Sequence, residues 1–333
     1  MAHHKISSTD PLLDSWHPPA EWGKIVFIRA KDLCSPEVNW GHRIIDGLVG
    51  FMGMMFPDIE VYYALEDAPG ANAWVARLGQ GYDGYMVCVS TGALELFHAR
   101  IMADRTMPRD LVSTIEEREI LEWIDGHAEF DAKQVLSFAA CAALLGHELG
   151  HVHEGQLDMP GPADDIRLVS HAAEIAADAW AIRVASQIVK PIFDAMRSQA
   201  PSEVHEVACS VLEAKMILYA NGLLEDIDLR HTWTPKDRNE GDEHPVGAAR
   251  FLSTAVALIE WKERTASREM ALATTVMATG PVLRLLGSHE GISPMGLHLL
   301  ELLADRYDES KDYIDEAREL YERWMEREQS GED

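Results

Sequence analysis

The chain has 333 residues and a formal net charge of −27, with 56 acidic residues against 29 lysines and arginines. This excess of negative charge argues against nucleic acid or an anionic membrane surface as a partner, because phosphate groups would be repelled. A hydrophobic fraction of 47% is ordinary for a globular protein, and the length suffices for one large or two modest domains.

Cysteine usage and the apolar pattern indicate a cytoplasmic protein. Cys34, Cys88, Cys141 and Cys209 form no Cys-x-x-Cys pair, so we expect reduced thiols in the core rather than disulfides or a metal knuckle. The N-terminal residues lack the apolar core of a signal peptide. No apolar run of about 18 residues occurs, so we expect no insertion into a membrane.

The first part of the chain predicts short strands beside one helix. Strands are expected over 24–29 and 59–65, and the glycine-rich residues 79–84 predict a hairpin between the strands on either side. A helix is expected over 37–55, where Pro57 closes it.

The rest of the chain is predicted to be helical, because its apolar residues recur with helical spacing. The expected helices are 92–104, 109–125, 131–155, 166–199, 203–222, 246–265, 268–285, 294–305 and 309–329. The expected fold class is therefore α+β, with a small, mostly antiparallel sheet beside a large helical body. We expect a domain over 1–265 and a C-terminal helical extension over 266–333 that packs on it.

The most informative motif is the pentapeptide 147–151, which has the pattern HExxH. It ends a predicted helix whose residues 135–145 are small and apolar nearly all round, so this helix should be buried. Residues four apart share one helix face, so His147 and His151 can point two imidazoles at one ion. Glu148 lies close enough to act as a base on an activated water without being a ligand. This division of labour is typical of a zinc hydrolase.

A zinc site of this kind needs a third protein ligand, and Glu174 is the strongest candidate. It lies in a second alanine-rich helical segment, and two antiparallel helices joined by the loop over 158–165 can bring it beside the two histidines. Asp178, one turn later on the same face, suits a hydrogen bond to the other ring nitrogen of a ligand histidine. His153 and His171 are the rival ligands, and His153 lies off the shared face of the helix.

HExxH followed by a downstream Glu-x-x-x-Asp helix resembles the gluzincin metallopeptidases. Two further features resemble the CAAX-prenyl-protease-like peptidases within that group. Residues 72–75 (Asn-Ala-Trp-Val) and 85–94 look like the stretch before the active-site helix of that family. Residues 244–250 look like its HPxxxxR motif. Without membrane spans, the chain is more similar to the soluble minigluzincin relatives, and the phage-exclusion peptidases are a neighbouring possibility.

The resemblance implies a zinc-dependent metalloendopeptidase whose peptide substrate binds as an added strand along residues 72–76 or 86–90. His244 would face the reacting carbonyl and donate to its oxygen, and Arg250 would brace Glu174. One alternative is a regulatory or sensor protein that has the zincin fold and binds zinc without catalysis. Another is a metal-dependent hydrolase of a non-peptide substrate.

Overall fold

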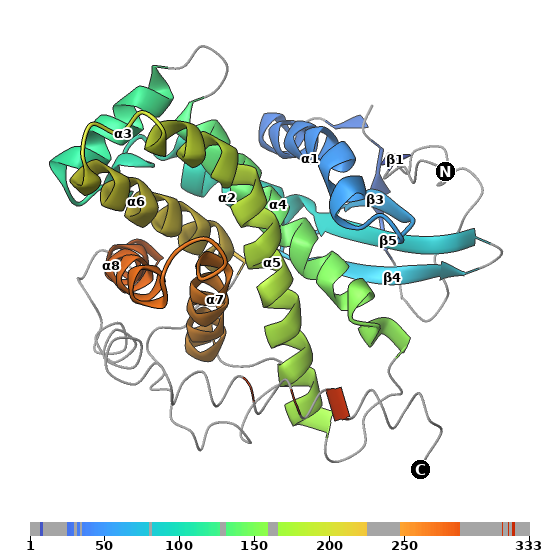
Figure 1. Cartoon of the computed structure of the whole chain (residues 1–333). Coiled ribbons are helices and arrows are strands. Elements are labelled where there is room, and N and C mark those ends of the chain that lie inside the picture. The colour runs from blue at the N-terminus through green and yellow to red at the C-terminus, as the bar shows by residue number, and fades with distance from the viewer. Residues whose placement is uncertain are drawn as a thin grey trace.

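The computed structural model of the chain describes residues 7–8, 25–29, 32–33, 35–79, 82–126, 131–158, 166–224 and 247–286, together with residues 315, 319, 322 and 323. Helices make up most of these residues and a small sheet lies at one side of them, so the expected α+β class is confirmed (Figure 1). The helix expected over 294–305 lies outside the described residues, as does nearly all of the helix expected over 309–329.

The sheet is mixed. Its strands are β1 (Ser7–Ser8), β2 (Phe27–Ile28), β3 (Val61–Glu66), β4 (Ala73–Gly79) and β5 (Tyr82–Ser90). The order is β1-β3-β5-β4, and β2 pairs with β3. The expected hairpin is confirmed, because β4 and β5 pair antiparallel. The expectation of a mostly antiparallel sheet is wrong, since β3 pairs parallel with both β1 and β5. The reason is the path of the chain: β4 runs to the edge, and β5 returns between β3 and β4 in the direction of β3.

The position of β5 excludes one of the two strands expected to bind a peptide. β5 has a partner on each side, so residues 86–90 cannot accept an added strand. β4 pairs with β5 and is the last strand in the order of the described sheet. The side chain of Trp74 on β4 donates from Nε1 to Glu66 on β3 over 2.8 Å, which ties the edge strand to the far side of β5.

The end of β5 turns directly into α2 (Thr91–Phe97). The Ser90 hydroxyl caps this helix by accepting the N–H of Ala93 at 3.1 Å. A Cβ added at Gly92 would lie 2.3 Å from the carbonyl oxygen of Pro69, so only glycine fits there without moving the backbone. This part of the family-like stretch over 85–94 thus has a local structural role, which is to fix where the hairpin ends.

The helical body surrounds one large core. Its helices are α1 (Pro36–Met55), α3 (Ile115–Asp125), α4 (Ala132–His153), α5 (Ile166–Arg197), α6 (Glu203–Gly222), α7 (Gly247–Lys262) and α8 (Arg268–Leu286), with a π-helical turn at His98–Ala103 and 3₁₀ turns at Arg109–Leu111 and Gln156–Asp158. These bounds agree closely with the expected helices, with two exceptions. The helix expected over 92–104 is divided between α2 and the π-helical turn, and the helix expected over 109–125 is divided between a 3₁₀ turn and α3. α8 packs on α6 within the same core, and the division of the chain at residue 265 stays a prediction.

α4 lies at the centre of the molecule, between α5 and the β4–β5 hairpin (Figure 1). Its apolar residues are buried as expected. By length and composition alone α4 is apolar enough to cross a membrane, contrary to the expectation that no segment qualifies. The most apolar 18-residue segment of α4 has a mean hydropathy of 1.4, because it holds many small residues and few charges, although it contains no unbroken apolar run. Of this segment, 89% is buried inside the protein.

The described cysteines are free thiols in the core. Cys88, Cys141 and Cys209 are free and buried, as expected, and Cys34 lies outside the described residues.

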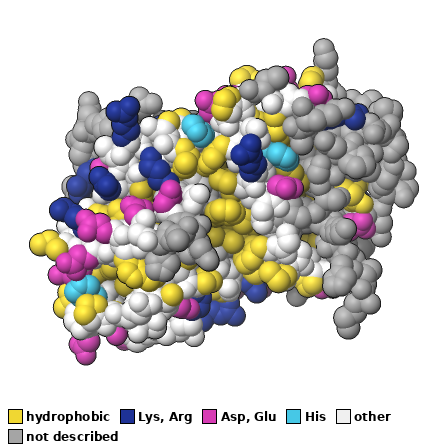
Figure 2. All heavy atoms as spheres, turned by 90° about the horizontal axis from the view of Figure 1, so that it is seen from above, with side chains coloured by type: hydrophobic (Ala, Val, Ile, Leu, Met, Phe, Trp, Pro, Cys, Tyr) yellow, Lys and Arg dark blue, Asp and Glu magenta, His cyan; other side chains and the backbone are white. Residues whose placement is uncertain are grey.

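On the face shown in Figure 2, acidic and basic side chains are interspersed with hydrophobic ones, and the coloured residues form no large patch of one sign.

Candidate metal centre

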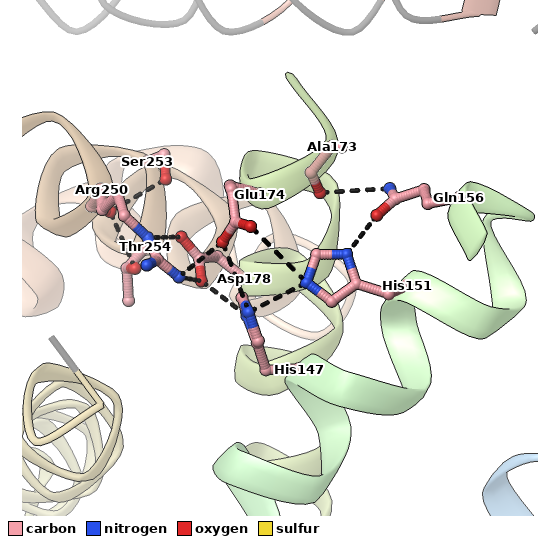
Figure 3. A network of polar contacts seen from close by, with 9 residues as sticks. All are labelled: His147, His151, Gln156, Ala173, Glu174, Asp178, Arg250, Ser253 and Thr254. Carbon is pink, nitrogen blue, oxygen red and sulfur yellow. Dashed lines mark hydrogen bonds and ion pairs between the residues drawn. The ribbon is translucent and has the colours of Figure 1, made fainter. Parts of the chain in front are cut away.

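Two glycines of α4 let α5 approach it closely. A Cβ at Gly146 would lie 2.9 Å from Cβ of Val184, and a Cβ at Gly150 would lie 3.0 Å from Cα of Ala177. Real Cβ atoms are rarely found so close to another heavy atom, so side chains at these positions would force the helices apart. The close packing brings the start of α5, with Glu174, next to the HExxH turn of α4 (Figure 3).

His147, His151 and Glu174 converge on one point. The Nε2 atoms of the two histidines are 3.1 Å apart, and they lie 3.4 Å and 3.8 Å from the Glu174 carboxylate oxygens. One potential ligand atom from each of the three residues lies within 4.8 Å of the others. The three residues expected from the sequence are therefore placed together, and they could hold a metal ion.

The cluster is buried and carries a strong local field. His147, Glu174 and Asp178 are only 9%, 7% and 3% exposed. Burial alone would lower the pKa of His147, but its contacts with Asp178 and Glu174 outweigh burial and raise its pKa to about 10. Burial, and then the neighbouring His147, lower the pKa of His151. The surroundings therefore favour one positive charge at this place, which is also the charge balance that suits a bound cation.

Asp178 and Arg250 contact the converging residues from α5 and α7. Nδ1 of His147 lies 3.0 Å from Oδ1 of Asp178, as the position of Asp178 one turn after Glu174 suggested. Arg250, from α7, donates from Nε and Nη2 to the two Asp178 oxygens at 3.1 Å and 2.7 Å, and Nη2 also lies 3.3 Å from Glu174. Burial would raise the pKa of Asp178, but Arg250 and then His147 outweigh it and lower this pKa. Arg250 thus contacts Glu174 as expected, although its bidentate partner is Asp178.

Gln156 is a contact that the sequence did not suggest. It lies in the 3₁₀ turn after α4, and its Nε2 donates to the carbonyl oxygen of Ala173 over 3.2 Å (Figure 3). This bond fixes the amide so that Oε1 faces Nδ1 of His151 and accepts its N–H. Nε2 of His151 then carries the lone pair that faces Glu174. A turn outside the helical repeat gives no periodic signal, and this is why sequence reasoning missed Gln156.

Glu148 follows His147 on α4. It is buried, and it is not one of the three converging residues. Burial, and then the carboxylates of Glu66 and Glu148, raise the pKa of the Cys88 thiol on β5 well above its ordinary value. Glu148 is therefore near enough to the hairpin to influence it electrostatically.

The remaining predicted residues divide into two groups. His153 packs against the ring of Trp180, with ring centroids 4.4 Å apart, and does not belong to the converging group. The described residues thus favour Glu174 over His153 as the third candidate ligand. His244 and the side chain of His171 lie outside what the structure describes.

Comparison of the chain with protein-family models, with curated proteins and with solved structures gives no match. The resemblance to gluzincin peptidases therefore stays a prediction. The structure contains a buried group of two histidines and one glutamate. Asp178, Arg250 and Gln156 each contact one residue of this group.

Proposed function

We propose that the protein is a zinc-dependent metallopeptidase in which His147, His151 and Glu174 hold the metal. The observation that carries this proposal is the convergence of these three side chains. Glu148, which follows His147 on α4, supplies a buried carboxylate outside the converging group. Three protein ligands from histidine and carboxylate are the usual set of a catalytic zinc site, in which the fourth position stays open.

The spacing of the ligand atoms supports zinc. Zinc bonds of roughly 2.1 Å with tetrahedral angles require ligand atoms roughly 3.4 Å apart. The two Nε2 atoms are 3.1 Å apart and His147 Nε2 lies 3.4 Å from Oε2 of Glu174, both near this value. His151 Nε2 lies 3.8 Å from the other oxygen of Glu174, Oε1. The imidazole and carboxylate donors also suit zinc better than calcium or magnesium, which prefer oxygen ligands only.

The residues around the triad have distinct tasks in this proposal. Zinc held there would supply a Lewis acid that lowers the pKa of a water and polarises a substrate carbonyl. Glu148 would take the proton from the attacking water and pass it to the leaving amine. Arg250 would keep Asp178 and Glu174 ionised and oriented, because its guanidinium contacts both carboxylates.

The place of β4 in the sheet supports a peptide as the substrate. An extended peptide can bind beside a strand through its backbone, independently of its side chains. β4 lies against α4, the helix that carries HExxH, and is the last strand in the order of the described sheet. A peptide bound along β4 would run beside the helix that carries Glu148. In this proposal His244 donates to the carbonyl oxygen as negative charge develops on it.

Two substitutions test the proposal by separating ligand from base. The wild-type protein should bind one zinc per chain and cleave members of an unstructured peptide library. Glu148→Gln should retain zinc and lose cleavage, because an amide cannot accept the proton. Glu174→Ala should lose zinc itself, since two histidines alone leave too few ligands. Metal content by mass spectrometry and cleavage by chromatography provide both readouts on the same preparations.

The outcomes distinguish the alternatives. Full peptide cleavage by Glu148→Gln would reject the role of this residue as base. Zinc retained by Glu174→Ala would reject the ligand set. A wild-type protein that binds zinc tightly and cleaves no peptide would reject the peptidase and leave the zinc-binding regulator.

A further inference from the structure

A pocket with several charged side chains lies away from the metal centre, where α5, α6, α7 and α8 meet. Its volume is about 420 Å³. Gln187 is the first α5 residue to line it, nine residues after Asp178, which is about 13 Å along the helix axis. Its charged side chains are Lys190, Asp194, Arg197, Glu213, Lys262 and Arg264.

The pocket reverses the charge balance of the chain. Four positive side chains face two carboxylates, which leaves a net charge of two positive units. In the whole sequence, by contrast, 56 acidic residues outnumber 29 basic ones. A local excess of positive charge in so acidic a protein needs an explanation other than composition.

The two carboxylates are already shared between cations. Asp194 lies 2.7 Å from Arg197 and also pairs with Lys190. Glu213 lies 2.8 Å from Arg197 and 3.8 Å from Lys262. Each of the two carboxylates is therefore shared by two basic side chains. No described carboxylate lies within ion-pair distance of Arg264.

Lys262 is the most deeply buried basic side chain of the pocket. Its side chain is only 11% exposed, and Nζ donates to the carbonyl oxygen of Ser210 over 2.7 Å. Burial lowers the pKa of Lys262 to about 8 in spite of the opposing effect of Glu213. A negatively charged group in the pocket would stabilise the ammonium form of this side chain.

An apolar wall completes the pocket. Trp261, Ile217 and Met270 line it, and the guanidinium of Arg264 lies 4.9 Å from the centre of the Trp261 ring. Met270 is 43% exposed although it is a large hydrophobic side chain. A volume of about 420 Å³ is in the range of small-molecule sites, which combine apolar walls with a few polar groups.

We propose that this pocket binds a small organic anion. Its carboxylate or phosphate group would contact Lys262 and Arg264, and its apolar part would pack against Trp261 and Met270. The pocket is distinct from the metal centre, so this inference does not depend on the proposed peptidase activity.

Calorimetric titration of the protein as purified with phenyl phosphate tests this proposal, since phosphate bound at the metal centre would not respond to substitutions in this pocket. We expect saturable binding with a Kd of about 1 mM or lower. Arg264→Gln should weaken binding by roughly ten-fold, because it removes one charge-assisted contact, and Lys262→Met should do the same. Arg105→Gln, the same change at an exposed arginine outside the pocket, should leave the Kd unchanged. A parallel titration with benzoate distinguishes a carboxylate ligand from a phosphate ligand.

Two results would overturn the proposal. One is the absence of saturable binding of both probes at about 10 mM, roughly ten times the weakest Kd expected. The other is an equal loss of affinity in Arg264→Gln and Arg105→Gln, which would show attraction by net charge alone. Arg264 is exposed, so its variant keeps the test valid even where Lys262→Met fails to fold.

Discussion

Each imidazole of the candidate metal centre has a separate neighbour for its outer nitrogen. Nδ1 of His147 faces Asp178, and Nδ1 of His151 faces Gln156. Both Nε2 atoms are thereby directed toward Glu174. Such neighbours set the tautomer and the orientation of a ligand ring, and their loss commonly weakens metal binding by about 10- to 100-fold.

Replacement of Gln156 by leucine should weaken metal binding by about 10- to 100-fold while the fold persists. The substitution removes the acceptor for His151 Nδ1 and the bond to the carbonyl of Ala173, the residue before Glu174. Competition with a coloured chelator measures the affinity. Gln199→Leu, the same change at an exposed position, serves as control. Equal affinities in the two variants would show that Gln156 does not position His151.

Metal binding at pH 7 should release about one proton. The pKa of His147 is raised to about 10 in the metal-free protein, so the ring is protonated at pH 7 and must lose its proton to bind a metal. The pKa of His151 is lowered, so this ring is already neutral. Affinity should therefore fall about ten-fold for each unit by which pH decreases below 7. Calorimetry in buffers of different ionisation enthalpy counts the protons, and a binding enthalpy independent of buffer would contradict the expectation.

At the scale of elements, the contact between α4 and α5 determines whether the ligands meet. Gly150→Ala should weaken metal binding, because the new Cβ would lie 3.0 Å from Cα of Ala177 and from Cβ of Trp180. α5 would have to move, and Glu174 would move with it. Overpacking of this kind costs about 1–3 kcal/mol, which exceeds the gain of roughly 1 kcal/mol from alanine over glycine in a helix.

The matched control for this prediction is Gly50→Ala in α1. A Cβ at Gly50 meets no heavy atom within 4 Å, so the helix propensity of alanine should dominate and raise stability by up to about 1 kcal/mol. Chemical denaturation should therefore show a lower free energy of unfolding in Gly150→Ala and a higher one in Gly50→Ala. Metal affinity should fall in Gly150→Ala and stay unchanged in Gly50→Ala. If Gly150→Ala also stabilises the protein and retains its metal affinity, the close contact of α4 and α5 is not limiting.

The elements that sequence reasoning predicted well are those with a local signal. Helical periodicity predicted the bounds of α5 and α6 to within two residues, and the spacing of HExxH predicted that His147 and His151 share a face. The parallel pairing of β3 with β5 was missed, because alternation along a strand says nothing about the neighbour of that strand. The contacts of Gln156 were missed because the turn that carries it lies outside the helical repeat. The bidentate bond from Arg250 to Asp178 was missed because it depends on how α5 and α7, which are far apart in the sequence, pack together, and no local pattern encodes this.

At the scale of the whole molecule, one fully buried ion pair joins α3 to α6. Lys215 and Glu117 are 1% and 2% exposed at the side chain, and Lys215 Nζ lies 2.8 Å from both carboxylate oxygens. Lys215→Met should lower the free energy of unfolding by about 3–5 kcal/mol, because it leaves a buried carboxylate without its partner. Urea denaturation measures this loss.

The double variant Glu117→Gln with Lys215→Met should recover part of that stability, since it removes the uncompensated charge and keeps a residue that can complete the capping box of α3. Lys190→Met, which breaks an exposed ion pair with Asp194, should cost less than about 1 kcal/mol. A loss at Lys215 as small as the loss at Lys190 would show that the buried pair contributes little to stability.

The place of β4 has a consequence for how copies of this protein meet one another. β4 is the last strand in the order of the described sheet, and a strand at such a place can pair with the same strand of a second copy, which is a route to aggregation. Arg77 is an exposed charge on β4, and charged side chains on such strands oppose this pairing. The net charge of −27 adds repulsion between whole molecules. The acidity of the chain therefore acts in the same direction as Arg77, against association of one copy with another.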